Sequence, residues 1–295
     1  MATAFCDANL KRNNSVLGDM RWATCLLFTA AVSAQEPPSK TVLQQASESY
    51  REATVLCDAG RYLEAEPYFQ RALAAHRLLA EGNEGYIMAE LHNLGVIARK
   101  RGEFQQSLDL LNQSLAVSRK RNAARSGANT LIELANTYRA MDKPYDADPL
   151  IREAIATSKQ LSPPDPQVYA GACNTYGALH LRLQDPEGAI RWFQRALEAA
   201  RRLPVIQPDL EAAVIANLAT AQFAGGNGEQ ALGLFRESIS MQEKYLGPTH
   251  PKLAETLASY SSVLRRLRHK DEAAEANRRA VQIRNSLVAP KPSIQ

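Results

Sequence analysis

Histidine and cysteine are the side chains best suited to metal binding or nucleophilic catalysis, and this chain of 295 residues has few of either. The histidines are His76, His92, His180, His250 and His269, and the cysteines are Cys6, Cys25, Cys57 and Cys173. No histidine lies in a His-Glu-x-x-His helix, the cysteine spacings fit no zinc or redox motif, and no Gly-x-Ser-x-Gly elbow is present. The glycine-rich stretch 225–228 lacks the lysine of a phosphate loop. We therefore expect a protein that is not an enzyme and that uses no cofactor or metal.

Small side chains recur in one phase along most of the sequence. The stretch 176–196 reads as two antiparallel helices with a turn at 184–187, small residues at Gly177, Ala189 and Ala196, and a large one at Phe193. The first small position is held by Ala53, Gly95, Ala135, Gly177, Ala219 and Ser261, and the position twelve residues later by Ala65, Ser107, Ala147, Ala189, Ala231 and Ala273. Successive copies are 42, 40, 42, 42 and 42 residues apart. Because a small residue lets a partner helix approach and a large one fills the adjacent gap, the pattern predicts six stacked helix pairs.

This skeleton of small, small, large and small positions resembles that of tetratricopeptide repeats. The usual period of that family is about 34 residues. The longer spacing here, and the stretch Leu246-Gly-Pro-Thr-His-Pro-Lys-Leu-Ala-Glu-Thr-Leu257, resemble the kinesin-light-chain subgroup. The resemblance covers about residues 40–288 and implies an all-α, right-handed α-solenoid whose first helices line a concave face. It is informative about fold more than about function, since the fold serves many partners.

The resemblance also implies where a partner would bind, because members of the family hold extended peptides or partner helices on the concave face. Carried over by position, the inward-facing and helix-end residues are Asn93, Arg99, Lys100, Asn136, Arg139, Asn174, Arg182, Asn217 and Arg265. An amide can both donate to and accept from a peptide backbone, and a guanidinium binds carboxylates in bidentate fashion. We therefore expect a protein or peptide partner, with a basic rim that favours acidic ligands.

Structural roles for the same residues remain open. Asparagine at the position of Asn93 and Asn217 is common in the family and can serve helix packing, and arginines near helix ends interact favourably with the helix dipole. The carboxylate clamp of chaperone-binding members needs cations where this chain has Asn129 and Glu133. That departure argues against a receptor for chaperone C-terminal peptides.

The first forty residues do not fit the repeat. Residues 20–34 combine a basic residue, a short apolar run and Val-Ser-Ala, which is typical of a secretory signal peptide cleaved after Ala34. This predicts a periplasmic or secreted protein, with Met20 as an alternative start to Met1. An uncleaved N-terminus and a cytoplasmic location are the alternative.

The sequence accordingly divides into a signal peptide (1–34), a linker (35–40), a solenoid of six repeats (41–288) and a disordered tail (289–295). The net charge of +4 is modest, which disfavours nucleic acid as a partner, and the apolar run is too short for a stable membrane span. We expect a scaffold or adaptor for protein–protein interaction. The alternatives are a regulatory or sensor module working with a separate effector and, less favoured, a nucleic-acid-binding helical repeat.

Overall fold

The computed structural model describes residues 38–79, 82–205 and 207–288, and every regular element in those ranges is an α-helix. The predicted signal peptide, residues 35–37 of the predicted linker and the predicted tail lie outside the described residues, whereas residues 38–40 of the linker belong to the first helix. The helices are α2 (Pro38–Asp58), α3 (Tyr62–Leu78), α4 (Glu84–Arg101), α5 (Phe104–Lys120), α6 (Ala124–Ala140), α7 (Pro144–Gln160), α8 (Pro166–Arg182), α9 (Pro186–Arg201), α10 (Pro208–Ala224), α11 (Gly228–Leu246), α12 (Pro251–Arg266) and α13 (Lys270–Val288).

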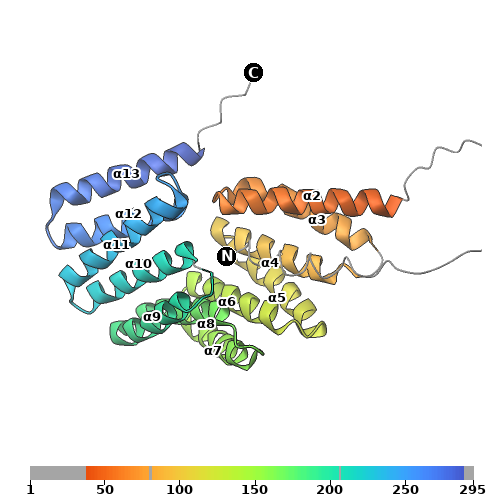
Figure 1. Cartoon of the computed structure of the whole chain (residues 1–295), viewed down its shortest axis with the longest axis horizontal. Helices are drawn as coiled ribbons and strands as arrows, with labels where there is room; N and C mark the ends of the chain where they lie inside the picture. Colours follow the sequence, from red (N-terminus) through yellow and green to blue (C-terminus); the bar gives the residue numbers. More distant parts are fainter. Residues whose placement is uncertain (1–37, 80–81, 206, 289–295) are drawn as a thin grey trace, which may run out of the picture.

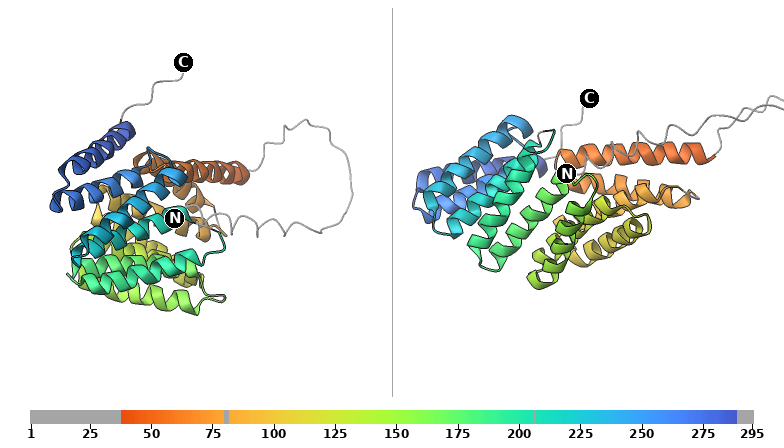
Figure 2. Two further views of the ribbon diagram at one scale, coloured as in Figure 1. Left: turned by 60° about the vertical axis from the view of Figure 1, so that its left-hand side comes forward. Right: turned by 60° about the horizontal axis from the view of Figure 1, so that its bottom comes forward.

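Consecutive helices form six antiparallel pairs, from α2–α3 to α12–α13, and the pairs stack into a curved array (Figure 1). This confirms the all-α class and the six repeats expected from the small-residue pattern. The two further views in Figure 2 show the same stack of helix pairs from other sides. The first helix begins at Pro38, three residues before the expected start of the solenoid at Thr41.

Helix starts and turns follow local chemistry. Six of the described helices (α2, α7, α8, α9, α10 and α12) begin at a proline, whose fixed φ and missing N–H suit the first turn. Inside each pair the turn contains one residue with positive φ. These residues are Gly60, Gly102, Asp142, Gln184, Gly226 and Arg268. They recur with the same spacing as the small residues, so the left-handed turn is part of the repeat.

Contacts between the small and the large positions hold each pair together, and we call these contacts the seam. A side-chain carbon added at Gly177 would lie 2.7 Å from the ring of Phe193, and one at Gly95 would lie 2.6 Å from Cγ of Leu111. Alanine or larger at either glycine would therefore push the two helices apart. Phe193 and Leu111 are each fully buried. Where the seam has a serine, its hydroxyl is satisfied by the backbone, as in the 2.9 Å bond from Ser114 to the carbonyl of Met88.

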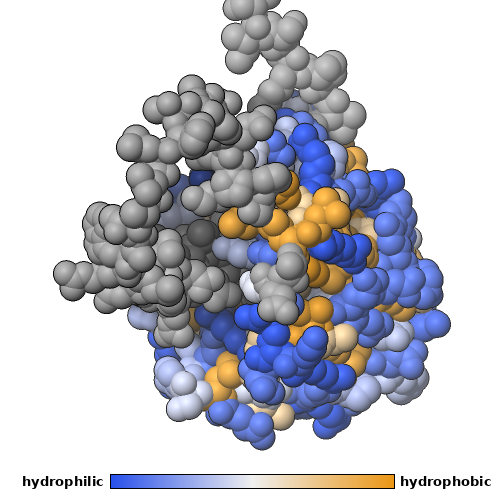
Figure 3. All heavy atoms as spheres, turned by 90° about the vertical axis from the view of Figure 1, so that its right-hand side faces the viewer, coloured by the Kyte–Doolittle hydropathy of each residue, from blue (hydrophilic) through white to orange (hydrophobic). Residues whose placement is uncertain are grey.

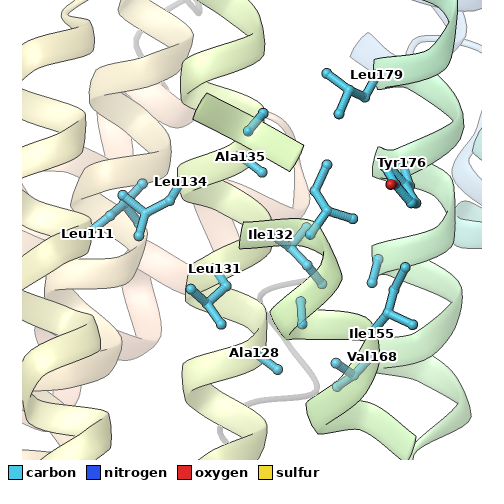
Figure 4. Close-up of a cluster of buried hydrophobic side chains, with 14 of the residues drawn as sticks. Leu111, Ala128, Leu131, Ile132, Leu134, Ala135, Ile155, Val168, Tyr176 and Leu179 are labelled. Atoms are coloured by element: carbon cyan, nitrogen blue, oxygen red, sulfur yellow. The ribbon is translucent and has the colours of Figure 1, made fainter. Parts of the chain in front are cut away.

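The seams merge into an extended core that runs through the array. Figure 4 shows its central part, where side chains of α6 face those of α5 on one side and of α8 on the other. Cys173 is fully buried, as expected for a small apolar residue, and burial raises the pKa of its thiol to about 11. Both ends of the array are less apolar. Glu52 in α2 and Asn277 in α13 occupy core positions of other repeats but are exposed, which suits terminal repeats.

One ionisable pair is enclosed in the core between the first two repeats. Nδ1 of His76 lies 2.6 Å from Oε1 of Glu90, and neither side chain is exposed. The ring of Tyr86 stacks on His76 at 4.7 Å between centroids. Burial raises the pKa of the Glu90 carboxyl, against the opposing effect of the hydrogen bond to His76. His76 Nε2 and Glu90 Oε2 have no hydrogen-bond partner among the described residues.

The surface away from these seams is mainly hydrophilic. Figure 3 shows the side of the molecule that lies to the right in Figure 1, with hydrophobic residues gathered in a few small areas among charged ones. The most exposed large apolar side chains include Leu63, Leu78 and Tyr145, which are spread over different helices. Scattered apolar residues of this kind are normal on a monomer surface. No helix in the described ranges has the length and apolar character needed to cross a bilayer.

Candidate functional site: the concave groove

The first helices of the repeats line the inner face of the array. Contacts join α4 to α6, α6 to α8, α8 to α10, and α10 to α12, so these helices form a continuous inner wall. The second helices lie between them and toward the outside, as Figures 1 and 2 show. We call the inner face of α4, α6, α8, α10 and α12 the groove. All nine residues expected to bind a partner lie on these five helices.

Two of the four amides expected in the groove are bonded to each other. Nδ2 of Asn217 in α10 donates to Oδ1 of Asn174 in α8 at 2.9 Å, which leaves the remaining amide groups of both side chains for a ligand. Asn136 accepts a long bond of 3.5 Å from Arg139. Asn93 is different, because it is only 8% exposed and therefore belongs mainly to the wall of the groove. The packing role left open for Asn93 fits this position.

Three of the five expected cations already have a carboxylate partner. Arg99 donates to Glu133 of the next repeat at 2.9 Å, and Arg182 donates to Asp142. Lys100 lies 3.8 Å from Glu255, and its ammonium also lies 4.7 Å from the ring centroid of Tyr62. The basic rim expected from the sequence is therefore largely neutralised by acidic residues of neighbouring repeats.

Arg139 is the cation of the inner face whose charge is least compensated. Its Nε is buried and has no hydrogen-bond partner among the described residues, and its Nη2 reaches only the amide of Asn136. Burial lowers the pKa of Arg139, and the neighbouring charges of Arg99 and Arg182 lower it further, while Glu133 acts in the opposite direction. A partly buried guanidinium without a carboxylate partner among the described residues is costly, so this position favours an incoming anion. Arg265 is exposed, and no ion pair joins it to another of the described residues.

Glu133 and His92 complete the charged centre of the groove, and sequence reasoning did not count them among the binding residues. Burial alone would raise the pKa of Glu133, but the charges of Arg99 and His92 and the hydrogen bond from Arg99 outweigh it and lower the pKa. The His92 ring lies 3.2 Å from the hydroxyl of Thr130, and burial lowers its pKa. The sequence signal for Glu133 was that it stands 40 residues after Asn93, at the same position of the next repeat.

A second hollow lies outside the groove, between α7, α8 and α9. It has a volume of about 700 Å³ and is lined by residues that include Arg152, Tyr176, His180 and Trp192. Its polar side chains are already engaged, since the Tyr176 hydroxyl donates to Asp148 at 2.7 Å and His180 lies 2.8 Å from Asp185. The hollow is shallow and open, so we place the candidate site in the groove. Among the described residues, no group of three or more His, Cys, Asp or Glu side chains could hold a metal ion.

Comparisons with known proteins agree with this architecture. Tetratricopeptide repeat models match residues 45–120, 86–160 and 210–286, and a further one matches residues 170–202. These matches cover most of the chain, which therefore belongs to the tetratricopeptide repeat family. No curated protein matches the sequence.

Among solved structures of the same fold is a kinesin light chain repeat protein from Podosopora anserina, with 18% identity, a TM-score of 0.50, and coverage of 70% of this chain and 98% of the other. BtubC from P. vanneervenii has 18% identity, a TM-score of 0.51, and coverage of 72% and 94%. A Rap protein solved with Competence and Sporulation Factor has 15% identity, a TM-score of 0.63, and coverage of 83% and 76%. At these identities the likeness establishes the fold alone.

Proposed function

We propose that this protein is a non-catalytic scaffold that holds a segment of a partner protein in the groove. The observation that carries the proposal is Arg139, a guanidinium on the inner wall whose Nε is buried and which has no carboxylate partner among the described residues. It lies one turn from Asn136 in α6, and the next two first helices supply the bonded amides of Asn174 and Asn217. A peptide with one acidic side chain would satisfy the guanidinium while its backbone bonds to the amides.

The neutralised rim narrows the preference for acidic ligands. Arg99, Lys100 and Arg182 already interact with Glu133, Glu255 and Asp142, so a ligand carboxylate at any of these three cations would have to displace an existing partner. We therefore propose a ligand with a single acidic anchor rather than a strongly acidic segment. The Rap protein, which was solved in complex with Competence and Sporulation Factor, supports the idea that this fold can bind a ligand.

Affinity capture tests the proposal. The tagged wild-type chain is used to capture partners from the native envelope fraction, which are identified by mass spectrometry, and the same is done with Arg139→Ala and with Asn174→Ala/Asn217→Ala. Arg119→Ala is the matched control, since Arg119 is exposed on α5 and pairs only with Glu153. We expect partners that are retained by wild type and by Arg119→Ala and lost with Arg139→Ala. Equal capture by all variants would contradict a role for the groove.

Export remains part of the proposal, because the predicted signal peptide lies outside the described residues. N-terminal sequencing of the protein from the periplasm or medium tests it, and we expect the mature chain to begin at Gln35. A chain that keeps residues 1–34 and stays in the cytoplasm would contradict export. The alternative role, a sensor module for a separate effector, predicts that the captured partner is encoded beside this protein and changes its activity on binding.

A further inference from the structure

The two ends of this solenoid touch each other. Repeats in a solenoid normally contact only their neighbours, yet the turn after α2 meets the start of α12, which lies 192 residues later. Nε2 of His250 lies 3.2 Å from the backbone carbonyl oxygen of Asp58. A side-chain carbon added at Gly60 would lie 2.2 Å from Cγ of Pro251. Close contact of this kind shows that the array curves far enough to bring its first and last repeats together.

The imidazole of His250 joins two helix ends. Its Nδ1 accepts a hydrogen bond from the backbone N–H of Lys252 at 3.2 Å and so caps α12. The proton of the neutral ring must then be on Nε2, which can donate to the carbonyl of Asp58. That carbonyl belongs to the last turn of α2 and has no partner within its own helix. One neutral side chain thus satisfies the end of α2 and the beginning of α12, and burial lowers its pKa.

Gly60 is the other half of this contact. Its φ is +72°, and the equivalent glycine of the next repeat, Gly102, has a φ of +82°. An added side-chain carbon at Gly102 would meet nothing within 4 Å, whereas at Gly60 it would overlap Pro251. The left-handed turn therefore explains both glycines, but only Gly60 also lets another repeat approach. On the inner side the ion pair of Lys100 with Glu255 spans the same gap.

We propose that Asp58, Gly60, His250 and Pro251, with the Lys100–Glu255 pair, form a latch that closes the solenoid into a ring. In an open solenoid the terminal repeats unfold separately. With the latch closed, the first and last repeats also contact each other, so the opening of one removes a contact from the other. A second consequence rests on the proposed function: the latch also selects the partner. A closed ring admits a flexible segment by its free end, and it admits a looped segment only when the latch opens.

Hydrogen exchange of the full chain tests the latch, with Gly60→Ala compared with Gly102→Ala. Both substitutions put alanine into a left-handed turn and cost similar backbone strain. Only Gly60→Ala pushes Pro251 away. We expect exchange in α12 and α13 to accelerate by about tenfold in Gly60→Ala, which corresponds to roughly 1.4 kcal/mol of local opening, and to stay unchanged in Gly102→Ala. Equal exchange in α12 and α13 of both variants would overturn the latch.

His250→Asn tests the same contact from the other end. Asparagine retains a side-chain cap for α12 but cannot reach the carbonyl of Asp58 as the longer imidazole does. We expect faster exchange in α2 and α3, which lie in the first repeat. Slower or unchanged exchange there would contradict the latch. This test is independent of any distortion that Gly60→Ala causes in its own turn.

Zero-length carbodiimide cross-linking adds a direct geometric readout. Lys100 and Glu255 are close enough to form an amide in the monomer, and mass spectrometry identifies the linked peptides. We expect this link in wild type and in Gly102→Ala and its loss in Gly60→Ala. Its absence from wild type, or its presence only in a covalent dimer, would overturn ring closure. None of these measurements requires a bound partner. A negative result for the latch would therefore leave the groove proposal standing, and a failure of partner capture would leave the latch standing.

Discussion

The seam and the groove are built from the same helices but follow different rules. At the seam, residues of one size recur in phase through the repeats, and Ala135, Ala147 and Ala154 are each fully buried. In the groove, one position holds Asn93, Glu133 and Asn217 in different repeats. The difference shows that the in-phase positions determine the fold, while the positions that vary give each repeat its own chemistry. Substitutions at the two kinds of position should therefore separate stability from binding.

The largest loss of stability is expected at the large seam position. Phe193→Ala leaves a cavity beside Gly177 and should lower the free energy of unfolding by about 3–5 kcal/mol. Asn277→Ala is the matched control, because Asn277 holds the same position in the last repeat but is exposed. It should change stability by no more than about 0.5 kcal/mol. Urea unfolding of both variants measures the two effects, and a similar loss in both would contradict the assignment of the seam.

Enlarging a small seam residue should have the next largest effect. Ala273 in α13 is 2% exposed, and the neighbouring Ala274 is exposed to solvent. Leucine at 273 must displace the packed partner helix, so Ala273→Leu should cost about 1–3 kcal/mol. Ala274→Leu, on the outer side of the same helix, should cost within about 0.5 kcal/mol. Thermal melting measures the two effects. Equal melting temperatures would contradict the assignment of Ala273 to the seam and of Ala274 to the outer side.

Opposite pH responses are expected for one carboxyl in the core and one in the groove. Burial raises the pKa of Glu90 above its ordinary value of 4.5, so the unfolded chain ionises first and the stability due to this group falls as the pH rises above about 4.5. Glu133 has a lowered pKa, because Arg99 and His92 overcome the effect of burial. Its contribution is present above about pH 4.5 and is lost as the pH falls through the lowered value.

Glu90→Gln and Glu133→Gln, unfolded by urea at pH values from about 3 to about 8, measure these contributions separately. Relative to wild type, Glu90→Gln should gain stability as the pH rises, and Glu133→Gln should lose it. His76 faces Glu90, so each profile is compared with that of wild type at the same pH. Two difference profiles of the same sign would contradict the contrast between the core and the groove.

The smallest effect on stability is expected at the exposed end of the groove. Arg182→Ala removes an ion pair with Asp142 whose two side chains are 50% and 70% exposed. Exposed pairs of this kind contribute about 0–1 kcal/mol, so the melting temperature should hardly change. A loss comparable to that of Ala273→Leu would show that this rim supports the fold and would weaken the contrast between the two regions.

The sequence predicted the seam well, because its residues need only be the right size in the right phase. Phe193, Ala189 and Cys173 are each buried as expected, and the polar replacements at Glu52 and Asn277 are exposed. The backbone conformation of the turns was harder to predict from the sequence. The same left-handed backbone occurs at Asp142, Gln184 and Arg268, where no glycine marks it.

The groove could be predicted only as a set of positions. The pairing of Arg99 with Glu133 and of Lys100 with Glu255 depends on the rotation between repeats, which no local pattern encodes. For the same reason the sequence did not distinguish Arg139, which lacks a carboxylate partner, from its paired neighbours. Contact between His250 and Asp58 depends on the sum of the rotations over the whole array.

This meeting of the ends constrains how the chain can change in evolution. Open repeat arrays can gain or lose internal units, because each unit needs only its neighbours. Here a duplicated or deleted helix pair between the first and last repeats would carry His250 away from Asp58, and the contact between the end repeats would be lost. Six units of this curvature bring the two ends into contact, so the contact itself specifies the number of repeats.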